Sequence, residues 1–556
     1  MRIAGENMVN NGENARLIIL VFLLLICSLS PVIAQDWVYT TVKGDSLWNL
    51  SEKHLDSVLR YSQLKKINGI KHPRRMLPGT QIRIPMQWIR SNSVPAQILS
   101  MQGNAVLYLA DGSMQKGLAA GTLLHLGDRL KAGPDSSIAV KFADHSILTL
   151  YSNSVIRFDH LSAHGSTGMV DSRIHLLEGR LDTRVIPAQG PGSRFEIQTP
   201  SAISAVRGTE YRASVAEDLQ FSNIEVLKGQ VVVSGAKIKK LIDAGYGTQV
   251  AVGQPPLPAR HLLAAPEFKA MDSTLRSIHS VLSWQTVPGA VKYRIEVAEE
   301  ENFNTILWQQ FSQFLSTALP DIADGHYFIR LRAIDERGLE GQSAVNSIII
   351  DARPQAPLQL QPVHQFVLRA QVPQLQWSAS SEADKYRLEI AAEPGFKQLL
   401  LVRTNLSSNR FVPSDLSAAG LYFWRLYSIA ADGETGPVGT VRSYEIKPLP
   451  EKVDPQMNVA DDGKLVASWR SGTPGQVYQA QLAYDDVFSD LVFERKLNKP
   501  QVSFSAVTGQ IRYLRIRAIE ADGYQGAWGA TQRIDPLPDK SIWLIPGIGL
   551  LGLILL

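Results

Sequence analysis

An internal repeat in the second half of the chain is the feature that most constrains its fold. Residues 282–284 (LSW) recur as 375–377 (LQW) and 467–469 (ASW), so the three tryptophans are 93 and 92 residues apart. Two copies continue into alternating apolar and polar residues, 293–297 (YRIEV) and 386–390 (YRLEI). Such alternation is typical of strands with one buried face. A period of about 90 residues with one core tryptophan per copy predicts three tandem β-sandwiches.

The repeat predicts modules at 277–352, 358–447 and 453–535. A later motif also returns, since RLRAI at 330–334 matches RIRAI at 515–519, each followed by an acidic residue and a glycine. Proline-rich stretches between the modules indicate short, stiff linkers. The modules resemble fibronectin type III modules, a likeness of fold that implies spacers or surfaces for protein interaction.

Residues 94–253, upstream of the repeat, also indicate an all-β domain. Short alternating segments are separated there by Gly, Asp and Asn, a pattern typical of many short strands. Residues 199–215 (TPSAISAVRGTEYRASV) and 224–235 (IEVLKGQVVVSG) carry a Thr-Pro pair, the sequence VRGT and a later V-x-x-G. These marks resemble a FecR domain and imply a FecR-like all-β fold. A Pro-rich linker is expected to follow at 254–276.

Near the N-terminus, residues 38–86 predict the order strand, helix, helix, strand. Val38–Val42 favours a strand, Asp45 or Ser46 can cap a helix, and a Pro-Gly turn leads into a second strand. This segment resembles a LysM domain. The matching blocks are 39–40 (YT), 43–48 (KGDSLW), 64–70 (LKKINGI), 77–79 (LPG) and 82–85 (IRIP).

The LysM resemblance implies a binding site for N-acetylglucosamine chains. In this family, the turn after the first strand and the loop after the second helix form the walls of a shallow groove. That groove binds sugar through backbone hydrogen bonds and apolar contacts. The residues at matching positions are Gly44, Asp45, Ser46, Leu47, Gly69, Ile70 and Lys71. Asp45 and Leu47 also suit a helix cap and a core position. The stretch 70–76 is basic where the family often has small polar residues.

The letters GDSL at 44–47 also occur in a class of esterases, with the serine as nucleophile. Such a serine needs a histidine base oriented by an acid, and these hydrolases carry Asp-x-x-His for that purpose. None of the 11 histidines has an aspartate three positions before it. The chain also lacks the alternating βαβ pattern on which these enzymes are built. We therefore expect a turn rather than an esterase site.

Three further motifs suggest chemistry by their letters alone. GIGLLG at 547–552 matches a dinucleotide fingerprint, which requires a strand before it and a helix after it. His160 and His164 are four residues apart, without the glutamate between them that zincins carry. Residues 207–209 (RGT) favour a turn or β-bulge. We predict a chain that is not an enzyme, with no cofactor and no metal site.

Both ends of the chain are apolar. Residues 1–34 resemble a secretory signal peptide, and they contain Cys27, the single cysteine. The export that this implies would leave a mature chain without thiols. Residues 541–556 form a hydrophobic tail of 16 residues, short for a membrane-spanning helix. We expect either an anchor or sorting tail that contacts the membrane, or a segment packed on the last module.

These observations predict a multidomain, mainly β protein of the bacterial periplasm or cell envelope. The net charge is +4 with both signs interleaved, so no nucleic-acid partner is expected. The expected partners are peptidoglycan, through LysM, and an envelope protein of unknown identity. FecR-type periplasmic signalling is the alternative, although contact with a sigma factor would need a cytoplasmic segment. A peptidoglycan hydrolase would need a catalytic domain that none of the segments provides.

Overall fold

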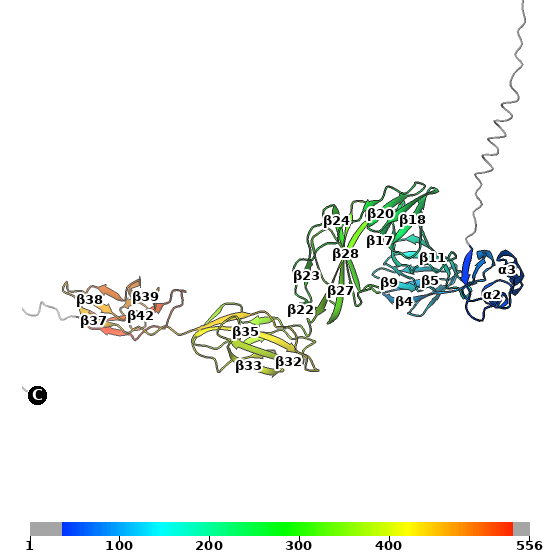
Figure 1. Cartoon of the computed structure of the whole chain (residues 1–556). Helices are drawn as coiled ribbons and strands as arrows, with labels where there is room; N and C mark the ends of the chain where they lie inside the picture. Colours follow the sequence, from blue (N-terminus) through cyan, green and yellow to red (C-terminus); the bar gives the residue numbers. More distant parts are fainter. Residues whose placement is uncertain (1–35, 507, 537–556) are drawn as a thin grey trace, which may run out of the picture. The chain divides into compact units, whose positions relative to one another are not determined.

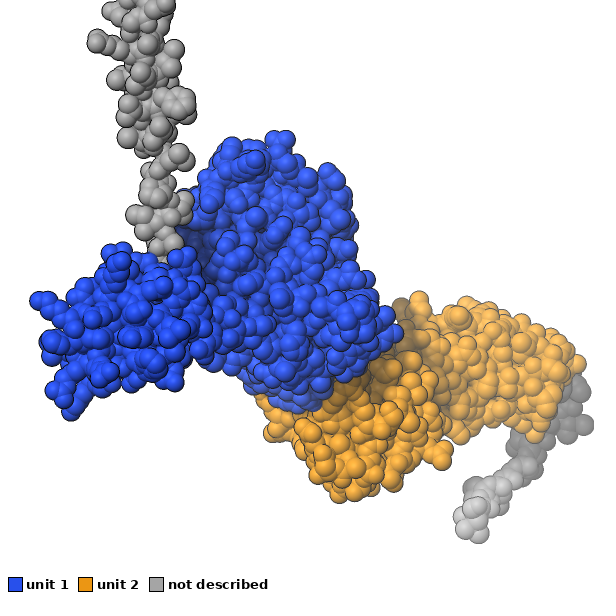
Figure 2. All heavy atoms as spheres, turned by 90° about the vertical axis from the view of Figure 1, so that its right-hand side faces the viewer, with its two compact units in different colours: residues 1–352 blue, residues 353–556 orange. Residues whose placement is uncertain are grey.

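The computed structural model describes residues 36–506 and 508–536, and it confirms a multidomain, mainly β protein (Figure 1). The expected signal peptide at 1–34 and the hydrophobic tail at 541–556 lie outside the described residues. The chain forms two compact units, residues 1–352 and 353–556, which Figure 2 draws in blue and orange. Among the described residues, no helix is both long enough and apolar enough to cross a membrane.

The first part of unit 1 has the strand–helix–helix–strand order expected of LysM. Strand β1 (Trp37–Thr40) pairs antiparallel with β2 (Gln81–Ile84), and helices α2 (Leu47–His54) and α3 (Tyr61–Ile67) lie between them in the chain. Short 3-10 helices occur at η1 (Val58–Arg60) and η2 (Met86–Trp88). The apolar faces of both helices pack on β2 to form a small core, which includes Leu47, Leu50, Leu64, Ile82 and Ile84.

Two large sheets follow and enclose a common core. One sheet has the order β21-β20-β17-β16-β13-β10-β9-β4-β7, and the other β19-β18-β15-β14-β12-β11-β8-β5-β6, with β3 paired to β11. The strands are β3 (Ser91–Ser93), β4 (Ala96–Gln102), β5 (Ala105–Tyr108), β6 (Met114–Gln115), β7 (Leu123–Leu124), β8 (Arg129–Ala132), β9 (Ser137–Lys141), β10 (Ile147–Leu150), β11 (Val155–His164), β12 (Val170–Glu178), β13 (Arg180–Arg184), β14 (Arg194–Gln198), β15 (Ile203–Val206), β16 (Glu210–Val215), β17 (Phe221–Lys228), β18 (Gln230–Gly235), β19 (Ile238–Asp243), β20 (Tyr246–Ala251) and β21 (Arg260–His261).

The first β-sandwich module completes unit 1. Its main sheet has the order β22-β28-β27-β24-β25, and β23 pairs with β26 opposite. Trp284 is buried in its core, as the repeat predicts. The strands are β22 (Thr274–Leu275), β23 (Val281–Ser283), β24 (Ala290–Ala298), β25 (Trp308–Ser312), β26 (Ser316–Ala318), β27 (Gly325–Asp335) and β28 (Glu340–Ile350).

The Pro-rich segment at 254–276 is paired to both of its neighbours rather than being only a spacer. Its strand β21 pairs with β20 of the preceding sheet, and β22 pairs in parallel with β28 of the module. Phe268 forms a β-bridge with Trp284. Apolar side chains that sequence reasoning leaves in a linker, such as Leu262, are buried here.

Unit 2 holds the other two modules, each with two sheets. The second has the orders β30-β36-β35-β32-β33 and β29-β31-β34, and the third β40-β39-β42-β43 and β37-β38-β41. Trp377 is fully buried, whereas Trp469 is half-buried against its core. The strands are β29 (Gln359–Gln361), β30 (Phe366–Arg369), β31 (Leu375–Trp377), β32 (Lys385–Ala391), β33 (Leu399–Leu406), β34 (Arg410–Phe411), β35 (Gly420–Ile429), β36 (Arg442–Lys447), β37 (Gln456–Val459), β38 (Leu465–Ser468), β39 (Val477–Ala483), β40 (Leu491–Leu497), β41 (Gln501–Phe504), β42 (Arg512–Ile519) and β43 (Gln532–Ile534).

Candidate functional site

The candidate glycan site lies where two loops of the LysM region meet. One loop joins β1 to α2, and the other joins α3 to β2. The backbone N–H of Leu47 donates to the carbonyl of Pro73 at 2.8 Å, and that of Gly79 donates to the carbonyl of Thr41 at 2.8 Å. The hydroxyl of Thr41 donates to the carbonyl of Leu77 at 2.6 Å. These three bonds hold the two loops side by side; that the loops are the walls of a sugar-binding groove stays a prediction from the LysM resemblance.

In the first wall, the side chains of Asp45 and Ser46 are engaged by the fold. The Asp45 carboxylate accepts from the Val42 N–H at 2.7 Å and from the Tyr39 hydroxyl at 2.9 Å, closing the turn. Gly44 has a φ of +99°, which a side chain would strain. Ser46 is the N-cap of α2, since its hydroxyl accepts from the Asn49 N–H at 3.1 Å. The GDSL letters therefore form a turn and a helix cap.

Leu47 points into the core rather than into the groove. Its side chain is fully buried beside Leu50 and Leu64. Its backbone N–H is also taken, by the carbonyl of Pro73. Leu47 therefore acts on the groove by fixing the position of the first loop.

The second wall combines a fixed backbone with an exposed charge. Gly69 has a φ of +60°, and Asn68 holds this loop to β2 through two hydrogen bonds with the backbone of Arg83, at 2.8 and 2.9 Å. Ile70 is half-buried against the LysM core, and Lys71 is exposed. This wall therefore offers backbone groups, a partly accessible apolar side chain and a cation.

Two exposed apolar residues on these loops are not among the site residues predicted from the sequence. Val42 is 57% exposed and Leu77 is 77% exposed, and they belong to the two loops that the Thr41 bond to Leu77 joins. Exposed apolar groups next to backbone donors suit the apolar faces of a sugar ring. The sequence indicates both residues in one way: each is an apolar residue in or next to a predicted loop, where polar residues are more usual.

The LysM region is anchored on the FecR-like region. Met169, just before β12, is fully buried in the LysM core, and β3, the strand that directly follows the LysM region, pairs with β11. Nδ1 of His54 lies 3.2 Å from the hydroxyl of Ser166. Burial is the main cause that lowers the pKa of His54 and of His164 at this contact. The contact holds the LysM fold against the β11–β12 hairpin.

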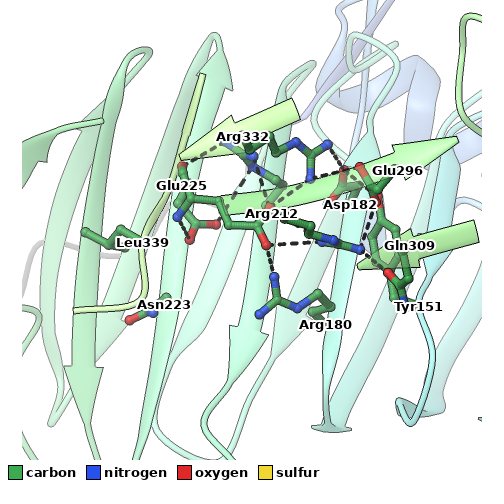
Figure 3. A network of polar contacts seen from close by, with 12 residues as sticks. Tyr151, Arg180, Asp182, Arg212, Asn223, Glu225, Glu296, Gln309, Arg332 and Leu339 are labelled. Atoms are coloured by element: carbon green, nitrogen blue, oxygen red, sulfur yellow. Dashed lines mark hydrogen bonds and ion pairs between the residues drawn. The ribbon is translucent and has the colours of Figure 1, made fainter. Parts of the chain in front are cut away.

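A second polar site lies between the FecR-like sheet and the first module (Figure 3). Strands β13, β16 and β17 present Asp182, Arg212 and Glu225 side by side. Arg332 of the module donates to Asp182 at 2.9 Å and to Glu340 at 2.8 Å. A cavity of about 500 Å³ lies at this junction, lined in part by Asp182 and Arg332.

Glu340 is the central anion of this junction. Its carboxylate pairs with four guanidinium groups, from Arg180 and Arg212 of the FecR-like sheet and from Arg294 and Arg332 of the module. Burial raises the pKa of nearby Glu225 to about 7 and lowers that of Arg212 to about 10. The ions are paired across two β-sheets, so the site is suited to holding domains together.

The RGT motif and the two histidines His160 and His164 make contacts within the fold. Arg207 donates to the carbonyl of Gly190 at 3.2 Å, and Gly208 has a φ of +81° in the turn between β15 and β16. A Cβ at Gly208 would lie 2.9 Å from Cα of Pro187. His160 contacts the Ser162 hydroxyl at 2.9 Å, and His164 is half-buried against Gly192. The motif at 547–552 lies outside the described residues.

Comparison with known proteins supports the two resemblances. Residues 39–85 match the family model of the LysM domain, and residues 128–232 match that of the FecR protein. No curated protein matches the chain. The family matches confirm the LysM and FecR-like assignments, and both kinds of domain are typical of bacterial envelope proteins.

Two solved structures show how distant the structural likenesses are. One, described as a candidate anti-sigma factor from Parabacteroides distasonis ATCC 8503, is 16% identical with a TM-score of 0.21. The match covers 24% of this chain and 59% of that one. The chicken CNTN1 FN1–FN3 domains are 14% identical with a TM-score of 0.20, over 49% of this chain and 98% of theirs.

Proposed function

We propose that this protein is a non-enzymatic component of the bacterial cell envelope that binds peptidoglycan through its LysM region. The observation that carries the proposal is the pair of joined loops at 41–47 and 68–79. These loops carry exposed Val42 and Leu77, half-buried Ile70 and the backbone turns at Gly44 and Gly69. Such a surface matches the N-acetyl groups and apolar ring faces of a glycan chain.

Co-sedimentation of the full chain with purified peptidoglycan tests this function. Ile70→Ala should weaken binding several-fold, because it removes an apolar contact from the second wall while the backbone stays in place. Leu59→Ala is the matched control, since Leu59 is 68% exposed in η1, at the opposite end of the two helices from the groove. Absence of binding by the folded wild-type chain would refute the proposal, as would equal binding by both variants.

The FecR-like region and the modules are proposed to serve protein interaction within the envelope. The family match at 128–232 favours a sensing role as the second candidate function. A sensing role requires an envelope partner whose binding changes when the FecR-like region is altered. Site-specific crosslinking from the exposed Arg207 should capture such a partner, whereas crosslinking from a position in the third module should not.

A further inference from the structure

The positive charge of this protein is concentrated beside the candidate groove. Residues 38–86 contain nine Lys or Arg and three Asp or Glu, a net of +6, whereas the whole chain has a net charge of +4. The rest of the chain is therefore slightly acidic. Acidic and basic residues balance one another in the rest of the chain, whereas basic residues predominate in the LysM region.

Three of these nine groups lie together in the second loop of the candidate groove, with a histidine between them. Lys71, His72, Arg74 and Arg75 are all exposed, and the segment 68–80 contains no acidic residue. The hydrogen bond from Leu47 to Pro73 ties the middle of this loop to the first wall. The basic side chains on both sides of Pro73 therefore border the groove.

The cations of this loop differ from Arg60 and Arg83 of the same region in having no acidic partner within the described residues. Arg60 pairs with Asp56 at 2.9 Å, and Arg83 pairs with Asp36 at 2.8 Å. Within the described part of the chain, Lys71, Arg74 and Arg75 have no acidic partner at salt-bridge distance. The nearby Asp45 carboxylate is already engaged by Tyr39 and Val42. Their charge is thus available to a ligand.

We propose that this basic loop binds carboxylates that flank the glycan, namely those of the peptide stems of peptidoglycan. The inference rests on the proposed function and narrows its ligand to a peptide-substituted, anionic glycan rather than a neutral N-acetylglucosamine polymer. Several exposed cations act together on such a chain, because each attracts any carboxylate within about 10 Å at 0.1 M ionic strength. This attraction weakens in salt, whereas groove contacts with the uncharged sugar do not.

The test measures binding of the full chain to three insoluble polymers. These are intact peptidoglycan freed of attached phosphate polymers, the same material after an amidase has removed the peptide stems, and chitin. The variant Lys71→Gln/Arg74→Gln/Arg75→Gln removes three charges. The control Lys116→Gln/Lys237→Gln/Lys239→Gln removes the same charge from exposed lysines of the FecR-like region. Thermal unfolding verifies that each variant is folded.

The loop variant should bind intact peptidoglycan about tenfold more weakly than wild type at low ionic strength, as expected for three exposed charge contacts. The difference should shrink in 0.5 M salt and on stem-free glycan, and chitin binding should stay within about twofold. Equal binding of intact peptidoglycan by the loop and control variants would overturn the inference and leave the proposed function standing. Wild-type binding to none of the polymers would overturn both.

Discussion

At the scale of single residues, Ser46 links the GDSL letters to the stability of the LysM fold. Its hydroxyl accepts the hydrogen bond of the Asn49 N–H at the start of α2. Ser46→Ala should lower the free energy of unfolding of this region by about 1 kcal/mol, the usual value of an N-cap. Hydrogen exchange of residues 38–86 in urea would measure it. Ser46→Asp keeps an acceptor and should preserve stability, so an equal loss in both variants would contradict the capping role.

One buried and one half-buried histidine, His54 and His164, should make the contact between the LysM and FecR-like regions sensitive to acid. Burial is the main cause that lowers the pKa of His54; the charge of Lys53 lowers this pKa further, and that of Asp45 partly offsets the shift. Burial is also the main cause that lowers the pKa of His164, where Asp171 opposes the shift and His160 adds to it. The unfolded chain therefore binds more protons than the folded one below pH 6.5, the ordinary histidine pKa. Stability is complete above that pH and falls as the pH drops toward the lowered values.

The measurement is the urea midpoint of the LysM region as a function of pH. Wild type should lose stability as the pH falls below 6.5, and His54→Gln should have a shallower slope because one titrating group is gone. His164→Gln should reduce the slope in the same way, because burial also lowers the pKa of His164. A steep slope that persists in His54→Gln would assign the effect to other groups.

At the scale of elements, the three modules share one device on the outer face of the main sheet. In the first, Arg330 donates from Nε to Glu296 at 2.6 Å and stacks 4.2 Å from the Phe303 ring. The corresponding arginine and phenylalanine in the other modules are Arg425 with Phe396 at 4.1 Å and Arg515 with Phe488 at 4.0 Å. The three phenylalanines all have positive φ angles of 52–63°. The three modules therefore also share a phenylalanine in a strained backbone conformation and an arginine that stacks on its ring.

This device should be essential to the second module. Arg425 donates to Glu389 at 2.7 Å, and that carboxylate is 2% exposed. Arg425→Leu leaves Arg387 as the remaining ion-pair partner of this carboxylate and should cost about 2 kcal/mol, the loss of a buried hydrogen bond to a charged group. Arg403→Leu is the control, because Asp415, its partner, is exposed and the pair contributes less than about 1 kcal/mol. Urea unfolding followed by hydrogen exchange of residues 358–447 measures both, and equal losses would contradict this role.

The elements that sequence reasoning predicts well are those determined by local pattern. The alternation of apolar and polar residues around Trp284 and Trp377 is a local property of the sequence. The strands of the sandwiches can therefore be predicted from it. The same alternation places Glu296 and Arg332 on the outer face of the sheet, where charged residues are expected to meet water. They are buried because a sheet distant in sequence covers them. Likewise, Leu47 matches a groove position by letters, but helical periodicity places it in the core.

At the scale of the whole molecule, the ion network explains why the FecR-like region and the first module form one compact unit. Ion pairs between sheets usually favour specificity over stability, because burying charge costs as much as pairing recovers. Here, Arg180 and Arg212 come from one sheet and Arg294 and Arg332 from the other, and Glu340 pairs with all four. Glu340 is therefore the carboxylate shared by the largest number of these cross-sheet ion pairs, and Asp182, which pairs with Arg332, adds a second anion to the junction.

Glu340→Gln should uncouple the two regions. The amide keeps the shape of the side chain but removes the negative charge, which leaves three buried guanidinium groups and the partly exposed one of Arg180 with one fewer anion. Breaking a buried pair costs about 3–5 kcal/mol. Calorimetry of wild type should show residues 94–352 unfolding together, and the variant should show two separate transitions and faster proteolysis within 254–276. Glu267→Gln, at an exposed position in that segment, should behave as wild type. A variant that still unfolds in one transition would show that the remaining contacts, such as Arg332 with Asp182 and the buried Leu262 and Leu339, suffice to join the regions.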